Sequence, residues 1–511
     1  MNALQFMERE LNISYTENGD IAYNSTGSAC LDFFYLCGGM RNRAKFLCKF
    51  FVKAYAENPV IAIKILFYMR NIRGGLGERY SFRLLLTELG KYYPETAKKV
   101  LYAIPEYGRW DDILVLLETP VKEDAINFIK NQIEKDNEAI KQGKEVSLLG
   151  KWLPSINTSS KESVALAKKL IKALGMKAVD YRKLCSSLRR EIKIIEDNLR
   201  RRDYTFDYSK QPSQAMLRYK KAFIRNDGER YQSFLNKVLE QATKIAKGEE
   251  IPEEEKVKLN TKTLYPYQIV APFCNGLGWR EVNVLQESEK IALEASWKAL
   301  DRKSFGSKTI VVRDGSGSMY HGGDDSPINI ATSLALLFAE QLTGPYRNSF
   351  ITFSNRPQLV QIPENCDSLE QKLHFIHQFN EVANTDISKV YELLLKTAKS
   401  GEVSKEEMIE RIVVISDMEF DFCAEGVSTF DYWKNEFEKA GYQLPEVVFW
   451  NVESRNSLIP VTENAKGVKL VSGASANILE SVMSGDLKVV TPYEFMLKML
   501  EPYSEFDKLA G

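Results

Sequence analysis

Three oxygen-bearing side chains alternate with glycine in a short loop that follows an apolar run. Residues 310–319 read IVVRDGSGSM, in which the leading Ile-Val-Val is typical of a strand buried on both faces. The glycines allow a tight backbone, so that Asp314, Ser316 and Ser318 can converge on one hard cation such as Mg²⁺, which prefers oxygen ligands and keeps several waters. The alternative is a Ser- and Gly-rich turn whose aspartate caps the helix that follows.

Two later loops place further oxygen ligands at the ends of predicted elements. Thr385 comes just before a helical run over 387–399, and Asp417 directly follows an apolar strand pattern over 410–416. The predicted strand 308–313 leads into the Asp314 loop. Ligands of open α/β sheets bind at the carboxyl ends of strands, so we expect these loops to share one edge of a sheet.

These residues resemble the von Willebrand factor A domain and its metal-ion-dependent adhesion site. The family pattern is D-x-S-x-S, then a threonine loop, then an aspartate after the fourth strand. It is matched in family order by Asp314, Ser316, Ser318, Thr385 and Asp417. The resemblance implies a doubly wound, mainly parallel sheet that binds Mg²⁺ or another divalent cation. It also implies a protein partner that offers an acidic side chain to the metal.

The rest of the C-terminal part alternates between strand and helix patterns, as an α/β domain requires. Strands are predicted over 308–313, 349–353, 358–362, 410–416, 446–452 and 468–472. Helices are predicted over 328–342, 367–379, 387–399, 429–440, 475–484 and 491–501. The sequence has no nucleotide-binding glycine fingerprint and no order of residues that supports a Ser-His-Asp nucleophile. We therefore expect a non-catalytic protein, although the acids at 417, 419 and 421 leave acid–base chemistry open.

The N-terminal part reads as a series of amphipathic helices with short connections. They are predicted over 41–57, 58–71, 78–92, 95–104, 110–118, 121–143, 161–174, 178–198, 213–225, 229–247 and 283–299. Such a series indicates antiparallel neighbours in a bundle or a HEAT-like solenoid. Residues 1–29 are polar and rich in turn signals, so we expect them to be irregular. The expected domains are 1–300, which is helical after its irregular N-terminus, and 301–511, the A-like domain.

Charge is divided between these two domains, although the whole chain has no net charge. Residues 1–300 contain 49 Lys and Arg against 38 Asp and Glu, whereas residues 301–511 contain 20 against 31. The stretch 151–225 alone has 19 basic and 7 acidic residues, a net charge of +12. This pattern favours a polyanion-binding part joined to an acidic one. A basic face that only docks the acidic domain is the alternative.

Basic residues are interleaved with aromatics in several landmark segments of the helical part. These are R-N-I-R-G-G-L-G-E-R (70–79), G-R-W-D (108–111), K-W-L-P-S (151–155), Y-R-K-L (181–184) and M-L-R-Y-K-K (216–221). Lys and Arg suit phosphates, and aromatics suit unpaired bases. The candidate RNA-binding residues are Arg70, Arg73, Arg79, Lys151, Trp152, Tyr181, Arg182, Lys183, Arg218, Lys220 and Lys221. A solvated helix face with core aromatics would show the same pattern.

In this order, ahead of an A domain, the landmarks resemble the Ro/TROVE family and its domain-of-unknown-function relatives. The resemblance covers roughly residues 35–500 and implies a ring of HEAT-like helices that the A domain closes. It further implies a ribonucleoprotein component, binding small non-coding RNA on a basic outer surface and single-stranded ends of misfolded RNA in a central hole. The alternative function is that of a protein-interaction scaffold, whose A domain binds an acidic residue of a partner protein through the metal.

Cysteine usage and hydropathy place the protein in a broad class. The seven cysteines are scattered and include no C-x-x-C pair, which favours reduced thiols in a cytoplasmic protein over disulfides or zinc. Residues 1–12 carry acids and no long apolar core, unlike a secretory signal. Apolar runs do not approach the roughly 20 residues that span a bilayer. We expect a monomer without a membrane partner.

Overall fold

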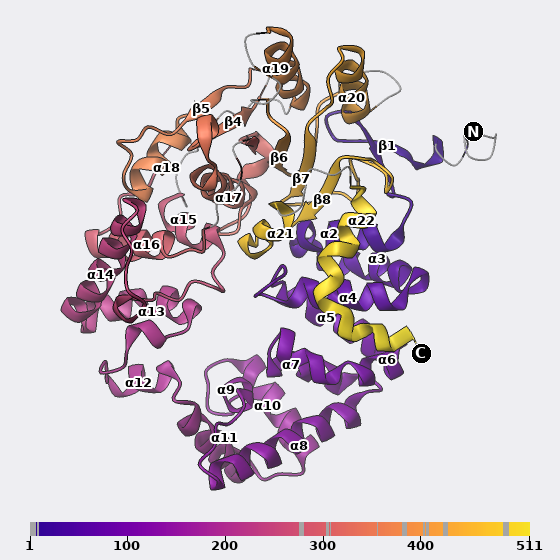
Figure 1. Ribbon diagram of the computed structural model, residues 1–511. Helices are drawn as coiled ribbons and strands as arrows, with labels where there is room; N and C mark the ends of the chain where they lie inside the picture. The colour runs from indigo at the N-terminus through magenta and orange to yellow at the C-terminus, as the bar shows by residue number, and fades with distance from the viewer. Residues whose placement is uncertain are drawn as a thin grey trace.

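The chain of the computed structural model follows a ring, with helices along most of it and an α/β domain that closes it (Figure 1). The structure describes Met7 and residues 10–274, 281–302, 306, 308–354, 356–380, 386–401, 404, 408–422, 428–483 and 490–510. No helix among these residues combines the length and the apolar character that crossing a membrane requires. The predicted fold class, a helical part followed by an A-like α/β domain, is confirmed.

The helical part forms most of the ring in Figure 1 and contains α-helices and one long 3₁₀ segment, η3. In chain order its main elements are α2 (Ala29–Gly39), α3 (Ala44–Glu57), α4 (Pro59–Arg70), α5 (Arg79–Tyr92), α6 (Pro94–Lys99), α7 (Ile104–Tyr107), η3 (Trp110–Glu118), α8 (Lys122–Lys141), α9 (Leu149–Trp152), α10 (Lys161–Leu174), α11 (Ala178–Ile192), α12 (Ile195–Arg201), α13 (Ser213–Asn226), α14 (Gly228–Ala246), α15 (Pro266–Cys274) and α16 (Glu287–Lys298).

Local sequence explains where these helices begin and end, and α10 shows how. The Ser160 hydroxyl accepts the amide of Ser163 at the N-terminus, which satisfies one of the free donors there. The buried residues Ala167, Leu170, Ile171 and Leu174 recur at helical spacing and form the core-facing stripe. Gly175 then ends the helix with a left-handed φ of 67°.

The structure of the helical part differs from the sequence predictions at several places. Residues 1–29 were expected to be irregular, but β1 (Ile13–Tyr15) and β2 (Ile21–Tyr23) form an antiparallel hairpin. No helix was predicted over α2, because its residues are apolar all round and show no amphipathic period. The single helix predicted over 178–198 divides at Lys193, whose φ of 52° ends α11 before α12 starts.

A six-stranded sheet in the order β5-β4-β3-β6-β7-β8 forms the α/β domain. All neighbouring strands are parallel except the β4–β5 pair. The strands are β3 (Thr309–Asp314), β4 (Ser349–Phe353), β5 (Leu359–Gln361), β6 (Arg411–Ser416), β7 (Glu446–Asn451) and β8 (Val468–Ser472). The helices are α17 (Pro327–Gln341), α18 (Leu369–His377), α19 (Ile387–Lys399), α20 (Thr429–Lys439), α21 (Leu479–Met483) and α22 (Pro492–Leu500). These bounds confirm the predicted elements to within a few residues.

The register of β3 and β6 explains why two acidic loops lie together. The strands are parallel neighbours, with Val312 opposite Val414 and Arg313 opposite Ile415. They therefore end side by side, and the residues that follow them leave the sheet at the same edge. Both strands are buried along their whole length, as their β-branched sequences predict.

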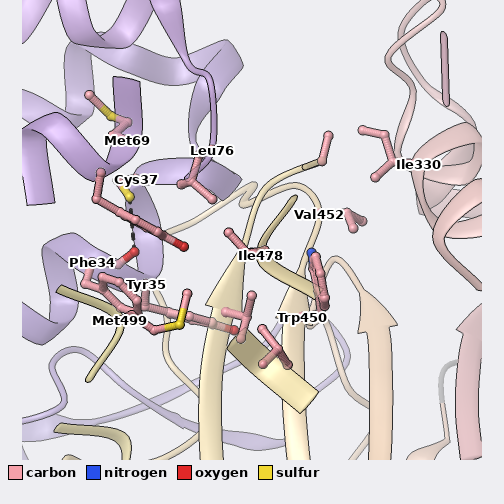
Figure 2. Packing of buried hydrophobic residues seen from close by; sticks show 14 of the residues in the cluster. Phe34, Tyr35, Cys37, Met69, Leu76, Ile330, Trp450, Val452, Ile478 and Met499 are labelled. Carbon is pink, nitrogen blue, oxygen red and sulfur yellow. Dashed lines mark hydrogen bonds between the residues drawn. The ribbon is translucent and has the colours of Figure 1, made fainter. Parts of the chain in front are cut away.

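The ring closes through contacts at both ends of the helical part. On one side α15 packs against α17, and α16 packs against α18. On the other side α2 packs against β7 and β8, while the C-terminal η9 (Glu501–Ala510) packs against α4. Figure 2 shows Phe34 and Tyr35 of α2 close to Trp450 and Ile478 of the α/β domain. The hydrophobic core is thus continuous across this junction.

Candidate cation site and basic surface

Asp314 is held in the interior at the end of β3 by two hydrogen bonds. Its Oδ1 accepts the Ser316 amide at 2.8 Å, and its Oδ2 accepts the Ser416 hydroxyl at 2.6 Å. The first bond comes from the turn that Gly315 begins, and the second comes from the last residue of β6. The Asp314 side chain is fully buried, so its carboxyl group is fixed in position before any ligand arrives.

The other predicted ligands that the structure describes surround this carboxyl group. The Ser316 and Ser318 hydroxyl oxygens are 3.0 Å apart in the loop and its short helix η6 (Gly317–Tyr320). Asp417 is buried, and among the described residues its Oδ2 has no hydrogen-bond partner of good geometry. The next residue, Met418, has a left-handed φ of 67°, a strained conformation that is often found at functional loops. Thr385 lies outside the described residues.

Electrostatics at this edge of the sheet favour a positive ion. Burial and, to a smaller extent, the nearby charge of Asp417 raise the pKa of Asp314, and together they outweigh the hydrogen bonds that lower it, so the pKa is about 7. Burial also raises the pKa of Asp417. A divalent cation would remove both penalties, since each carboxylate would gain a charged partner. Two carboxyl groups and two hydroxyls fit the oxygen-only preference of Mg²⁺.

The candidate ligands Asp314, Ser316, Ser318 and Asp417 differ from a metal site made only of carboxylate, imidazole or thiolate ligands. Among the described residues, no cluster of three or more His, Cys, Asp or Glu side chains is placed to hold a metal. A cation here would depend on hydroxyls and water for its remaining ligands. Because only two of its ligands would be charged and the others would be neutral hydroxyls and water, such an ion could exchange a water for an anionic group.

Sequence reasoning missed three residues that border these carboxyl groups. Ser416 precedes Asp417 directly and its hydroxyl holds Asp314, so the short pattern Ile-Ser-Asp was the available signal. Arg455 and Glu17 come from the loop after β7 and from the N-terminal hairpin. Arg455 Nε lies 3.2 Å from Asp417 Oδ2, and its Nη1 lies 2.7 Å from a Glu17 oxygen. Neither residue lies in a recognisable motif.

Some basic and aromatic residues of the landmark segments make contacts within the helical part. These contacts account for their presence without an RNA ligand. Arg70 is buried, and its Nε and Nη2 both lie 2.8 Å from Asp112 Oδ2. Arg83 of α5 approaches the other oxygen of Asp112. Arg70 therefore joins the first landmark to Asp112, the residue that follows the second landmark. Its prediction as an RNA contact is wrong because its guanidinium is buried.

Two other predicted RNA contacts are also engaged within the protein. Tyr181 is buried, and its hydroxyl donates to the Pro154 carbonyl oxygen at 2.8 Å, which ties the fourth landmark to the third. Lys220 is largely buried and lies 3.2 Å from Glu289. Lys221 lies 3.6 Å from the other oxygen of Glu289, but its side chain is 78% exposed. Tyr181 and Lys220 are therefore not available as RNA contacts, whereas Lys221 remains a predicted contact that also pairs with Glu289.

The landmarks also bring two cations close to one indole ring. The Arg109 guanidinium lies 4.2 Å from the centre of the Trp152 ring, and Lys151 Nζ lies 5.6 Å from it. Burial lowers the pKa of Arg109, and the positive charge of nearby Arg79 lowers it further. Arg79 and Arg73 are exposed. The sequence signal for Arg109 was the G-R-W-D landmark itself.

The remaining predicted contacts are solvent-exposed side chains of α11 and α13. Arg182 and Lys183 on α11 and Arg218 on α13 are exposed. The same stretch carries further exposed cations that the predictions did not include, namely Arg190, Lys193, Arg202 and Arg225. Among the described residues none of these seven forms an ion pair, in contrast to Arg200 and Arg201, which share Asp197. We call the seven cations the basic surface.

Fold and site together define a class of protein: a helical ring closed by an α/β domain with an acidic, hydroxyl-lined edge. Residues 16–133 and 123–302 match the family model described as Domain of unknown function (DUF2828). Residues 308–499 match the model described as Domain of unknown function (DUF7788). The chain belongs to the DUF2828 family.

Comparisons with individual proteins show similarity both in sequence and in structure. The uncharacterized protein L728 of Acanthamoeba polyphaga mimivirus is 30% identical over 529 residues, which cover 96% of this chain and 88% of the viral protein. The crystal structure of the Deinococcus radiodurans RO (RSR) protein matches 88% of this chain and 93% of its own, with 12% identity and a TM-score of 0.41.

Proposed function

We propose that the protein is a non-catalytic RNA-binding protein that binds small structured or misfolded RNA through its helical part. The observation that carries this proposal is the basic surface together with the Arg109–Trp152 stack. These cations come from consecutive helices and lack acidic partners among the described residues, so their charge is available to a polyanion. The order of the landmark segments, which resembles that of Ro/TROVE proteins, supports the same function.

The two groups of residues suit the two chemical parts of an RNA chain. Exposed Arg and Lys side chains contact phosphates whatever the base sequence, and each neutralised phosphate releases counterions. Trp152 with Arg109 offers a planar surface on which an unpaired base can stack. Single-stranded ends and loops expose both chemical groups at once. We therefore favour RNA with unpaired segments over a fully double-stranded helix.

Reversing the charge of the basic surface tests this proposal. The test variant changes four exposed cations to glutamate: Arg182, Lys183, Arg190 and Arg218. If each contacts one phosphate on a single strand, the log–log salt slope of binding should fall by about 0.7 per site. Filter binding of a small structured RNA with a single-stranded tail, at 50 and 200 mM salt, measures both affinity and slope. We expect weaker binding to all sequences alike.

A matched variant separates local contacts from overall charge. It changes four exposed lysines outside the basic surface to glutamate: Lys53, Lys237, Lys244 and Lys247. Its net charge equals that of the test variant, so the long-range attraction of RNA falls equally. Equal losses in the two variants, or wild-type binding in a folded test variant, would argue against a specific surface. The basic stretch would then be a docking face or a solvated face.

The acidic edge of the sheet supports a second candidate function. We propose that Asp314, Ser316, Ser318, Thr385 and Asp417 hold Mg²⁺ or another divalent cation. The supporting observation is the buried Asp417 oxygen without a well-aligned hydrogen bond beside the buried Asp314. When bound, the ion would supply an open position for an acidic side chain of a partner protein. A cation-dependent pull-down with an acidic peptide library tests this scaffold function, with EDTA as its control.

A further inference from the structure

Arg455 connects the candidate cation site to the turn of the N-terminal hairpin. One end of its guanidinium lies 3.2 Å from the buried Asp417 Oδ2, and the other lies 2.7 Å from Glu17 Oε2. The Arg455 side chain is 22% exposed, and that of Glu17 is 53% exposed. One cationic group is thus shared between a predicted metal ligand and a carboxylate that arrives from more than 400 residues away.

The position of Glu17 is determined by its backbone. Its amide donates to Glu419 Oε2 at 2.8 Å, and the next residue, Asn18, donates its side-chain amide to the Glu419 carbonyl oxygen at 2.7 Å. On the other side the Thr16 hydroxyl donates to the Phe420 carbonyl oxygen at 2.6 Å. Three bonds therefore hold the turn against the loop that follows Asp417. The Glu17 side chain is presented to Arg455 as a consequence.

A cation at Asp417 and the guanidinium of Arg455 are both positively charged, and both would bind the Asp417 carboxylate. A divalent ion would meet a positive charge only a few ångströms away, which opposes its binding. Glu17 offers Arg455 another carboxylate, so the guanidinium can leave Asp417 without losing all its partners. The poor alignment of the Arg455–Asp417 contact, in which neither facing atom has a hydrogen bond, fits a guanidinium divided between two acids.

We propose that Arg455 is a built-in competitor for the cation at Asp417, and that Glu17 sets how strongly it competes. Cation binding then transfers Arg455 toward Glu17 and tightens the N-terminal hairpin on the α/β domain. By linkage, a docked hairpin must raise the affinity for the cation by the same factor. This inference rests on the proposed cation site and assigns a positioning role to two residues outside it.

Titration calorimetry of the full-length protein with MgCl₂ at constant ionic strength tests the competition. Arg455→Gln removes the competing charge, so we expect Mg²⁺ to bind about tenfold more tightly than to wild type. Glu17→Gln leaves Arg455 with Asp417 alone, so we expect about threefold weaker binding. Arg455→Lys keeps the charge and should stay close to wild type, which separates charge from packing. Opposite shifts in the Gln variants are the signature of the proposal.

The double variant shows whether Glu17 acts through Arg455. With Gln at position 455, Glu17→Gln should change Mg²⁺ affinity much less than it does in wild type, because there is no guanidinium to redirect. An equal effect in both backgrounds would mean that Glu17 acts on the ion directly and would overturn the positioning role. Hydrogen exchange of residues 13–23 gives a second readout. Protection should rise with Mg²⁺ in wild type and stay unchanged in Arg455→Gln.

The outcomes separate this inference from the cation site on which it rests. If wild type binds Mg²⁺ and Arg455→Gln binds it equally well, the competition is wrong and the site stands. If wild type binds no Mg²⁺ but Arg455→Gln does, both stand. If neither binds Mg²⁺ at millimolar concentration while β3 and β6 keep their exchange protection, the cation site itself is wrong.

Discussion

The backbone amide of Gly38 donates to the Ser472 hydroxyl at 3.1 Å, although 434 residues separate them. Beside it, the Gly39 carbonyl oxygen accepts the Ser454 amide at 2.8 Å. The end of α2 therefore contacts the ends of β7 and β8 through its backbone. Such an approach is open to glycine alone, because a side chain would occupy the space between the elements.

Gly38→Ala should weaken this closure of the ring. The added Cβ would lie 2.8 Å from the backbone of Ser472 and Gly473, so main-chain atoms would have to move. We expect a loss of about 1–3 kcal/mol in the free energy of unfolding, measured by urea denaturation, and a larger radius of gyration in solution scattering. Gly228→Ala is the control, because its Cβ would meet no atom within 4 Å. Equal stability of the two variants would contradict the close approach.

Removing single ligands should lower the Mg²⁺ affinity by amounts that depend on the charge of the ligand. Asp314→Ala deletes a charged ligand and should abolish binding, whereas Ser316→Ala and Thr385→Ala delete neutral ligands and should only weaken it. Titration calorimetry measures each affinity. RNA binding in Asp314→Ala should remain close to wild type, because the basic surface lies on other elements. Unchanged Mg²⁺ affinity in Asp314→Ala would return the loop to the role of a helix-capping turn.

Asp20 should make the protein less stable as pH rises toward neutrality. Burial raises the pKa of this hairpin carboxyl group from 3.8 to about 7, against a hydrogen bond from Thr429. The folded state therefore holds the proton more tightly than the unfolded state, and the free energy of unfolding falls as pH rises from about 4 to 7. Between pH 5 and 7 the expected loss is roughly 2–3 kcal/mol.

Asp20→Asn isolates this contribution from other groups that titrate in the same range. The variant keeps the shape of the side chain and cannot ionise, so its stability should depend less on pH than that of wild type. Urea denaturation at pH 5, 6, 7 and 8 gives the two curves. Parallel curves would show that Asp20 has an ordinary pKa in the folded protein.

Glu340 should anchor the other junction of the ring. It accepts the Trp297 indole N–H at 3.0 Å and pairs with both Arg302 and Lys372, thereby joining α16, α17 and α18. Burial acts to raise its pKa, but the two cations outweigh burial and hold the pKa at about 2. Glu340→Gln should therefore cost about 3 kcal/mol at neutral pH, since it leaves two partly buried cations without their charged partner.

The pH dependence of this loss checks its origin. The folded-state pKa of Glu340 lies below its ordinary value of 4.5, so the stabilisation is complete above pH 4.5 and is lost as pH falls toward 2. Chemical denaturation of wild type and Glu340→Gln at pH 7 and pH 4 should show a smaller difference at pH 4. A difference that does not change with pH would indicate a packing effect.

The local elements and the meeting of Asp314 with Asp417 were predictable because their causes are local. Apolar β-branched runs such as that of β6 form strands over short distances, and helical periodicity recurs every three to four residues. Once β3 and β6 are parallel neighbours, the residues that follow them must leave the sheet at one edge. The acidic edge could therefore be predicted from the strand pattern and the order of the polar residues alone.

Pairings between distant segments were decided by the tertiary structure. From the sequence, Arg70 is predicted to be an exposed loop cation. In the structure it is buried and paired with Asp112, which lies 42 residues later in the chain. The apolar α2 carries no period that identifies a helix, and only the sheet against which it packs explains its composition. Glu17 and Arg455 meet because the hairpin folds over the α/β domain at the closure of the ring. The sequence does not identify the partner of a charged residue, since ion pairing depends on distance in space and not on separation along the chain.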